Sequence, residues 1–380
     1  MGIYPLYQPL DRNDGPTAVI EGKSVIMAGS NNYLCLTIHP EVRKASADAA
    51  MEFGTSFTGS RLLNGTHRLH GLLEGQLADF FDKEDSLVFS TGYQVNLGVI
   101  SALVDENSIL FMDKGDHASI YDAARLARGK VVRFDHNDEK ALEEAFKQAD
   151  PALGGQPGLG KIVIVDGVFS MEGNLCRLPE ILSVCKKYKA RLIVDDAHGV
   201  GTVGPGGRGT SHYFGLEKEV DLIIGTFSKT LASIGGFVAG DAKIIHYIKH
   251  FGRSIIYSAS LPAPNVAAVI CALKIMRREP ERVERVIANG RTMREGLKSI
   301  GLNIGISETP IVPIIIGDEL LTLTLWRELL NMGVYVNVAI HPAVPRGKSL
   351  LRTSYTSEHT REHLDRVLDI FSSLKKKHNL

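Results

Sequence analysis

The chain has 380 residues, of which 44% are hydrophobic, so it is long enough to bury a large core divided between two lobes. Lysine plus arginine and aspartate plus glutamate balance at 43 each, so the chain has neither a basic footprint for nucleic acid nor an acidic tail. No run approaches the ~18 apolar residues of a membrane span, and the N-terminus lacks the pattern of a signal peptide. The four cysteines form no Cys-x-x-Cys pair, which argues against zinc and disulfides. We therefore expect a cytoplasmic protein without a bound metal. Any contact with the inner face of a membrane is expected to be peripheral and to involve the basic tail 374–378.

The first part of the chain, residues 1–40, is predicted to be an irregular lead-in segment. Helices are then expected at about 40–53 and 70–81. Short β-branched runs follow at 86–90, 108–112, 130–134, 161–165, 191–195, 221–225 and 236–240. Most of these runs are separated by enough residues for a helix, which is typical of βαβ units. Residues 41–250 are therefore predicted to form a large α/β domain with a mostly parallel central sheet.

From residue 251 to 380 the pattern changes to long charged helices. These helices are expected at 264–300, 320–332 and 358–375, around strands at 310–316, 333–338 and 350–354. This part is predicted to be a smaller α+β C-terminal domain. The stretch 150–160 is rich in glycine and proline and is expected to be a surface loop inside the large domain.

The first motif along the chain, 90–96, lies where a strand meets a helix. A helix N-terminus presents free N–H groups to an anion, so Gly92 and Tyr93 are candidates to hold a cofactor phosphate through their backbone. An ordinary helix cap is the alternative. His117 follows the next strand and is placed to stack on an aromatic cofactor, although a lone histidine there is more often structural. His67 and His70 are expected to be structural, because no ligand cluster accompanies them.

A second motif ends the strand 191–195 with Asp195, Asp196 and, two residues later, His198. Ligands of open parallel sheets bind outside the carboxyl ends of the strands. A carboxylate there can keep a pyridine nitrogen protonated, and the imidazole can bond a phenolic oxygen. Neighbouring strand residues face opposite sides, so spacing alone leaves the choice between Asp195 and Asp196 open.

The next six residues, 199–204, match G-x-G-x-x-G and keep a nicotinamide-dependent oxidoreductase as an alternative from another class. That fingerprint needs its last glycine inside a helix. Pro205 and three glycines follow immediately, and a helix does not run through such a segment. We therefore expect no dinucleotide site here.

The most informative segment, 225–237, sets Lys229 among small hydroxyl residues, after an apolar run and before a glycine pair. A lysine desolvated at the end of a buried strand can lose its proton and form an imine with an aldehyde cofactor. Taken alone, a solvated surface turn is the commoner explanation of such a lysine. Together with the motif at Asp195, the segment indicates pyridoxal 5'-phosphate.

The last motif is Arg352, inside the apolar strand 350–354. An arginine in such a strand needs an anionic partner, and a bidentate carboxylate is the best one. The sequence leaves open whether that carboxylate belongs to a substrate or to a protein side chain.

With these residues in hand, the chain resembles the α-oxoamine synthases, pyridoxal-phosphate enzymes of fold type I, over essentially its whole length. The phrases that carry the resemblance are 116–120, 169–173, 225–229 with 235–238, and 341–345 followed by 351–352. Ser228 stands before the lysine where relatives that make aminooxononanoate or aminoketobutyrate typically have glycine. The bacterial serine palmitoyltransferases are therefore the nearest subgroup.

The resemblance implies a fold type I, aminotransferase-like architecture and a role for each matching residue. Lys229 would be the Schiff-base lysine, with His117 stacked on the ring. Asp195 would lie at the ring nitrogen and His198 at the ring hydroxyl. The phosphate would be held by Thr226, Ser228 and the amides of Gly92 and Tyr93, the amino-acid carboxylate by Asn31 and Arg352, and the phosphate of the partner subunit by Ser258 or Ser260. The active sites would then be shared across a homodimer.

The implied reaction joins L-serine to a long-chain acyl-CoA such as palmitoyl-CoA and releases CO2 and CoA. The product would be 3-ketodihydrosphingosine, at the first step of sphingolipid synthesis. Sister synthases that use alanine or glycine with a shorter acyl-CoA remain the alternative. Two departures bear on this choice: Cys35 stands where relatives usually have glycine, and Ile340 where some of the subgroup have arginine. The second leaves carboxylate recognition to Arg352.

Overall fold

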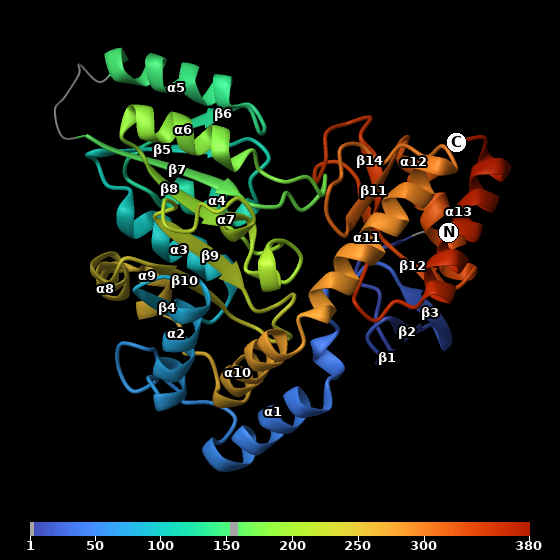
Figure 1. The fold of residues 1–380 in the computed structure, drawn as a ribbon, viewed down its shortest axis with the longest axis horizontal. Coiled ribbons are helices and arrows are strands. Elements are labelled where there is room, and N and C mark those ends of the chain that lie inside the picture. The colour runs from blue at the N-terminus through green and yellow to red at the C-terminus, as the bar shows by residue number, and fades with distance from the viewer. Residues whose placement is uncertain (1–3, 153–158) are drawn as a thin grey trace. The chain divides into compact units, whose positions relative to one another are not determined.

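The computed structural model describes residues 4–152 and 159–380, and its chain divides by contacts into two units (Figure 1). The large unit contains residues 40–169 and 175–278, and the small unit contains residues 1–39, 170–174 and 279–380. This division differs from the expected one at residue 250. The helix at 263–278 remains with the large unit, because it packs along the helix at 40–53.

The large unit is built around a seven-stranded sheet in the order β4-β10-β9-β8-β7-β5-β6. Its strands are β4 (Asp85–Phe89), β5 (Ser108–Asp113), β6 (Lys130–Phe134), β7 (Gly160–Asp166), β8 (Arg191–Asp195), β9 (Leu222–Thr226) and β10 (Gly236–Gly240). All neighbouring strands are parallel except those that involve β10, which runs antiparallel to both β4 and β9. The prediction of a mostly parallel sheet is therefore confirmed.

Helices flank this sheet, as expected of βαβ units. They are α1 (Pro40–Phe53), α2 (Arg68–Phe80), α3 (Gly92–Leu103), α4 (Ala118–Leu126), α5 (Glu139–Ala152), α6 (Leu178–Tyr188), α7 (Thr210–Tyr213), α8 (Ala242–Phe251), α9 (Arg253–Ile256) and α10 (Ala263–Arg278). Buried Val99 on α3, Ile120 on α4 and Ile245 on α8 belong to one core cluster with Leu110 and Ile224 of the sheet. Strands that helices cover on both faces have continuous apolar sequences instead of alternating apolar and polar residues. This explains the apolar runs in the sequence of the large unit.

One expected helix and one expected loop differ in the structure. The single helix predicted at 264–300 is two helices, α10 and α11 (Glu281–Ser299). Pro280 is the N-cap of α11, and a proline disfavours helical geometry at the residue before it. The loop predicted at 150–160 is also partly wrong, since α5 extends to Ala152; residues 153–158 of that stretch lie outside the described residues.

The small unit contains two sheets. The first has the order β1-β2-β3-β12, with strands at Arg12–Asn13, Thr17–Ile20, Lys23–Met27 and Val334–Tyr335. The prediction of an irregular lead-in is therefore wrong. The second is antiparallel, with β14 (Ser349–Ser354) between β11 (Ile311–Gly317) and β13 (Asn337–Ala339). The strand predicted at 333–338 is thus split between the two sheets.

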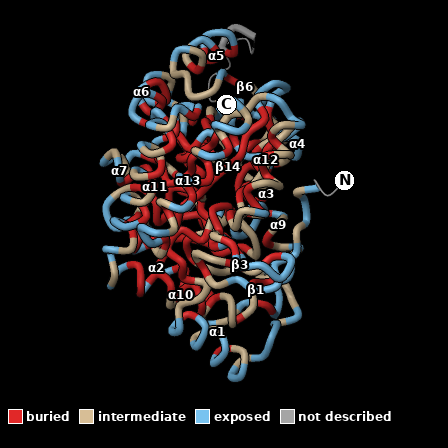
Figure 2. The backbone as a smooth tube through the Cα atoms, turned by 90° about the vertical axis from the view of Figure 1, so that its right-hand side faces the viewer, coloured by how far each residue is buried: buried red, intermediate tan, exposed pale blue. Residues whose placement is uncertain are grey.

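The core of the small unit lies between these sheets and its helices. Besides α11 the helices are α12 (Glu319–Asn331), α13 (Arg361–His378) and a single 3-10 turn, η1 (Leu36–Ile38). Trp326 on α12, Leu351 on β14 and Phe371 on α13 are buried in one cluster. Figure 2 shows the contrast between interior and surface: β14 is buried along its length, whereas much of α1 in the large unit is exposed.

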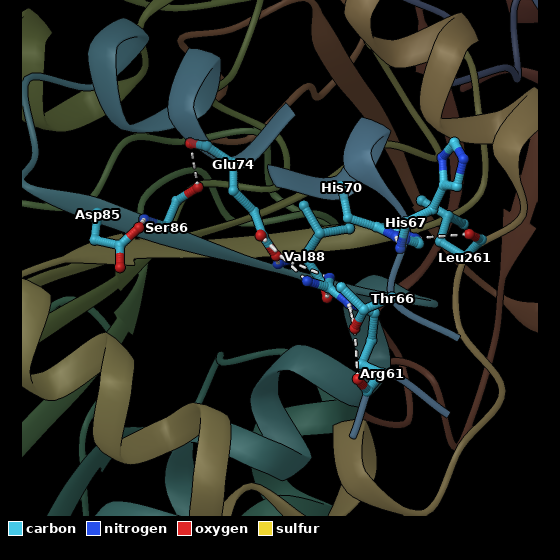
Figure 3. Close-up of polar contacts among 9 residues, drawn as sticks. All are labelled: Arg61, Thr66, His67, His70, Glu74, Asp85, Ser86, Val88 and Leu261. Atoms are coloured by element: carbon cyan, nitrogen blue, oxygen red, sulfur yellow. Dashed lines mark hydrogen bonds and ion pairs between the residues drawn. The ribbon is translucent and has the colours of Figure 1, made fainter. Parts of the chain in front are cut away.

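A buried ion pair fixes the segment before α2 to the edge of the large sheet (Figure 3). The guanidinium of Arg61 donates to both carboxylate oxygens of Glu74, at 2.8 and 3.2 Å. Glu74 Oε1 also accepts the N–H of Val88 at 3.0 Å, and the Glu74 carbonyl accepts the hydroxyl of Ser86 at 2.7 Å. We call Arg61, Glu74, Ser86 and Val88 the paired cluster.

His70 lies beside this cluster and is fully buried. Its Nδ1 accepts the N–H of His67 at 3.0 Å, so its Nε2 carries the hydrogen and donates to the carbonyl of Leu261 at 2.8 Å. Burial lowers the pKa of His70 to about 4. These contacts cap α2 and tie it to the start of α10, in agreement with the structural role expected for His67 and His70.

Candidate active site

A cavity of about 380 Å³ in the large unit lies where β7, β8 and β9 end. This is the carboxyl edge of the parallel strands, where open α/β sheets bind ligands. The cavity brings together most of the residues proposed from the sequence, namely Gly92, Tyr93, His117, Asp195, His198, Thr226, Ser228 and Lys229. These residues come from separate segments of the chain, so only folding collects them.

Lys229 lies in the loop that turns the chain from β9 back into β10. The loop is closed by backbone bonds from Phe227 N–H to the Gly235 carbonyl (2.9 Å) and from Ser233 N–H to the Phe227 carbonyl (3.0 Å). Gly235 has φ +121°, and a Cβ on it would come within 2.6 Å of the Phe227 ring, so the turn requires glycine. The result is a half-buried amine held at the end of a buried strand, as the sequence predicts.

The first turn of α3 forms a cradle with the hydroxyls that follow β9. Thr91 caps the helix, and its Oγ1 accepts the N–H of Gln94 at 3.1 Å. A Cβ on Gly92 would lie 2.7 Å from Thr226 Oγ1, so only glycine allows this close approach. Thr226 Oγ1 in turn lies 2.8 Å from Ser228 Oγ. A helix N-terminus beside two hydroxyls suits a phosphate group.

The structure places Asp195, and not Asp196, in the lining of the cavity. Asp195 Oδ2 accepts Asn96 Nδ2 at 2.7 Å, and its Oδ1 accepts the N–H of Ala197 at 3.0 Å. Asp196 instead accepts the N–H of Thr210 at 2.7 Å, and burial raises its pKa to about 7. Asp196 Oδ1 would lie 1.8 Å from a Cβ on Gly199, which shows how closely the backbone wraps this side chain.

His117 is linked to Asp195 through two residues that the sequence analysis did not single out. Asn96 Nδ2 also donates to Ser119 Oγ (2.9 Å), and Ser119 presents both its hydroxyl (2.8 Å) and its N–H (3.2 Å) to His117 Nδ1. His117 Nδ1 is therefore an acceptor, and the hydrogen of the neutral ring lies on Nε2. Burial lowers the pKa of His117, the Asp195 charge opposes this, and the Lys229 charge adds to it. Asn96 could have been found from its spacing, since it lies four residues after Gly92 on the same helix face.

Arg352 and Asn31 form a second polar group, in the small unit. Arg352 is buried; its Nε donates to the Ser170 carbonyl at 2.6 Å and its Nη1 to Asn31 Oδ1 at 3.1 Å. Its Nη2 is buried and has no hydrogen-bond partner among the described residues. None of the ion pairs found in the described chain involves Arg352, so the protein carboxylate that the sequence left open is not there. The Tyr33 hydroxyl also donates to Asn31 Oδ1 (3.3 Å).

Ser258 and Ser260 are not in the lining of the cavity. Ser258 Oγ accepts Gln94 Nε2 at 3.1 Å. Ser260 is buried, and its Oγ has no hydrogen-bond partner within residues 4–152 and 159–380. Their expected contact with a partner subunit stays a prediction. Cys35 has φ 53°, in the left-handed region that glycine favours, which explains why glycine is usual in relatives.

The rival glycine motif does not form a dinucleotide site in the structure. Residues 199–204 make turns after β8, and only a three-residue 3-10 helix, Pro205–Gly207, follows them. The helix that the fingerprint requires is therefore missing at this place, as expected from Pro205.

Comparisons with known proteins agree with this geometry. Residues 23–371 match the family model "Aminotransferase class I and II". The chain is 42% identical to a serine palmitoyltransferase of Sphingobacterium spiritivorum over 368 residues, covering 97% of this chain and 91% of that protein. It is 39% identical to an 8-amino-7-oxononanoate synthase of Thermoanaerobacter pseudethanolicus over 379 residues, covering 100% and 95%. A solved structure of the S. paucimobilis serine palmitoyltransferase with a bound PLP–myriocin aldimine matches with a TM-score of 0.93 at 36% identity, over 98% of this chain and 93% of that one.

The chain therefore belongs to the aminotransferase class I and II family, with its fold type I architecture. Within that family its relatives are α-oxoamine synthases, as the sequence motifs predict. The cavity fits the cofactor of the family, pyridoxal phosphate. It offers an amine at Lys229, a hydrogen-bonded carboxylate at Asp195, and a glycine-lined helix N-terminus at Gly92.

Proposed function

We propose that this chain is a pyridoxal-phosphate-dependent acyltransferase that condenses L-serine with a long-chain acyl-CoA, palmitoyl-CoA in the first place. The products are 3-ketodihydrosphingosine, CO2 and CoA. The observation that carries the proposal is the cavity in which Lys229 and Asp195 lie at neighbouring strand ends beside a phosphate cradle. The choice of serine is supported by the relatives named serine palmitoyltransferase at 41–42% identity.

The residues of the large unit would bind and orient the cofactor. Thr226, Ser228 and the first turn of α3 would hold its phosphate. Asp195, which accepts hydrogen bonds from Asn96 and from the N–H of Ala197, would hold the proton of the ring nitrogen. When bound, the cofactor supplies an electron-withdrawing ring that stabilises negative charge at the amino-acid Cα. His117 would cover the ring, and His198 would bond its hydroxyl.

Lys229 would move the reacting proton. Its amine removes the proton from the amino-acid Cα, a step in which a positioned general base contributes ~10²–10⁴-fold. A bond then forms between Cα and the thioester carbonyl carbon, and the carbon–sulfur bond breaks to release CoA. The bond from Cα to the carboxylate breaks next, CO2 leaves, and a proton returns to Cα.

Arg352 and Asn31 are proposed to bind the amino-acid carboxylate. The support is the buried Nη2 of Arg352, which has no hydrogen-bond partner among the described residues, together with the lack of a carboxylate beside this guanidinium. A guanidinium presents parallel donors that match a carboxylate, so binding here would also fix the direction of the Cα–H bond.

A substrate screen tests the proposed reaction. The purified, cofactor-loaded protein is mixed with serine, alanine or glycine and with acyl-CoA of increasing chain length, and released thiol is measured. We expect the highest kcat/KM with serine and palmitoyl-CoA. A clear preference for alanine or glycine with a short acyl-CoA would instead establish the sister activity, which the 39% identity to an oxononanoate synthase supports.

We also propose a homodimer in which Ser258 or Ser260 reaches the phosphate site of the partner subunit. Mixing inactive Lys229→Ala protein with an inactive Ser258→Ala/Ser260→Ala variant tests it, because shared sites would restore part of the activity in mixed dimers. If the mixture of the two variants were as inactive as each variant alone, the active sites would not be shared between subunits.

The protein is proposed to act in the cytoplasm, with peripheral membrane contact at most. No helix among the described residues is long and apolar enough to cross a bilayer. Fractionation of cells before and after a high-salt wash tests the peripheral contact, because basic residues bind anionic lipids in a salt-dependent way.

A further inference from the structure

Asp166 is a second carboxyl group in the cavity, and the reaction above gives it no role. It is the last residue of β7, and Asp195 is the last residue of the neighbouring parallel strand β8. The two residues are direct partners in the strand register. Partners on neighbouring strands point to the same face of a sheet, and both of these residues line the cavity. The fold therefore places two carboxyl groups side by side at the candidate cofactor site.

The hydrogen bonds of the two carboxyl groups differ. Asp195 accepts from Asn96 and from the N–H of Ala197, and each of its oxygens has a donor. Asp166 is buried, and its Oδ1 has no hydrogen-bond partner among the described residues. Donors favour the charged form of a carboxyl group, whereas burial of a carboxyl oxygen that lacks a donor favours the neutral form. The two environments thus push the pair toward one charged and one neutral member.

Burial and the neighbouring carboxyl groups act on Asp166 in the same direction, and the Lys229 charge opposes them. Burial raises the pKa of Asp166 well above its usual range, and the charges of Asp195 and Asp113 raise it further. The Lys229 charge and a hydrogen bond from the His117 N–H lower it. The carboxylate of Asp113 accepts the N–H groups of Gly115 and Asn137. The other titratable groups that face this site are Asp116, His117, His198 and Tyr93.

We propose that Asp166 is an uncharged positioning residue, a carboxylic acid beside Asp195 that keeps the charge of the pair at one. Asp195 is then the sole anion that faces the ring nitrogen of the cofactor. This inference rests on the proposed function only in so far as the cavity is the cofactor site. It deepens that function, because the protonation of the ring depends on a defined single charge at its nitrogen.

The protonation state is tested by infrared spectroscopy on the holoenzyme. We expect a carbonyl band of a protonated carboxylic acid at pH 7 that shifts on exchange into D2O and is lost in Asp166→Asn. Asp116→Asn and Asp196→Asn are measured beside it, because burial also raises the pKa of these two carboxyls outside the cavity lining, and the bands lost in those variants are thereby separated from the band of Asp166. A spectrum in which Asp166→Asn removes only a carboxylate band overturns the proposal.

The positioning role is tested by three variants at the pair. Asp166→Asn keeps a neutral group of the same shape, so turnover and the pH midpoint of the cofactor absorbance should stay within about threefold and a few tenths of a pH unit of the wild type. Asp166→Ala removes the group and should shift that midpoint and lower turnover by more than about tenfold. Asp195→Asn should lose turnover far more than Asp166→Asn.

Two outcomes overturn the positioning role. If Asp166→Asn were as inactive as Asp195→Asn, Asp166 would act as an anion. If Asp166→Ala left the absorbance midpoint unchanged, Asp166 would not act on the cofactor. Melting temperatures of all variants separate these outcomes from misfolding. None of the measurements depends on which amino acid is the substrate. Failure of the proposed function in the substrate screen can therefore be distinguished from failure of the proposed role of Asp166.

Discussion

Two buried groups of charged residues in the large unit show opposite kinds of construction. In the paired cluster, Arg61 donates to both oxygens of Glu74, and Glu74 also accepts a backbone N–H (Figure 3). In the cavity, one buried oxygen of Asp166 has no hydrogen-bond partner in the described parts of the chain, and burial raises the pKa of this carboxyl. A satisfied buried network stabilises one conformation, whereas unpaired titratable groups around a cavity are typical of sites that act on a ligand.

Substitutions in the two groups are therefore expected to affect different properties of the protein. Changes in the paired cluster should lower stability and leave the chemistry of the remaining folded protein intact. Changes at Lys229 and Asp195 in the cavity should stop or strongly slow the chemistry and leave stability nearly unchanged. Variants that do the reverse would break the comparison.

The largest effect is expected from Lys229→Ala, which should abolish turnover without a change in melting temperature. The reason is that the only proposed base for the Cα proton is removed. Borohydride treatment of the wild-type holoenzyme should attach the cofactor to Lys229, which peptide mapping would show. Recovery of the label on another lysine would refute the assignment.

Arg61→Met should produce the largest loss of stability, about 3–5 kcal/mol of unfolding free energy, because it leaves the Glu74 carboxylate buried and uncompensated. Urea unfolding measures it. The double variant Arg61→Met/Glu74→Gln is the control, since it removes the buried charge as well and should be less destabilised than the sum of the single variants. Full additivity would mean that the pair is not coupled.

Asp195→Asn should retain the cofactor but slow the exchange of the amino-acid Cα proton by about 10²–10³-fold, since a neutral amide does not hold the ring nitrogen protonated. Exchange into D2O followed by NMR measures this step alone. Asp196→Asn is the matched control and should be mild in rate, because Asp196 lies outside the cavity lining. If proton exchange were strongly slowed in Asp196→Asn and only slightly in Asp195→Asn, then Asp196 would be the residue at the ring nitrogen.

His70 should make the paired region sensitive to acid. Its folded pKa of about 4 lies below the usual value of 6.5, so the unfolded chain binds a proton first and stability falls as pH drops from 6.5 to 4. The loss is on the order of 3 kcal/mol at its full extent. The difference in unfolding free energy between the wild type and His70→Gln should therefore narrow over this range. A constant difference would show that His70 is not buried in its neutral form.

The smallest effect, and the one that tests the small unit, is expected from Arg352→Lys. A point charge does not reproduce the planar fork, so amino-acid binding should weaken by about 1.5–3 kcal/mol, with cofactor affinity and melting temperature nearly unchanged. Titration of the amino acid against the cofactor absorbance measures it. An unchanged dissociation constant would place the carboxylate elsewhere, with Asn31 the first residue to examine.

The elements that could be predicted were those with strong local patterns. The strands 130–134, 191–195 and 236–240 and the helix 40–53 agree with the structure to the residue. The misses have local causes as well. Residues 12–27 form strands too short for a clear alternation, and the split at Pro280 was hidden by continuous helical composition on both sides.

The sequence by itself determined the chemistry that the protein offers: a lysine after a buried strand, a carboxylate pair at another strand end, and a glycine where a helix begins. These are properties of short segments, which carry their own propensities and spacing. Only the tertiary structure decided which of two adjacent aspartates lines the cavity, that Asp166 lies beside Asp195, and that Arg352 has no carboxylate partner among the described residues. Each of these depends on contacts between segments far apart in the chain, and local patterns do not encode which partners meet.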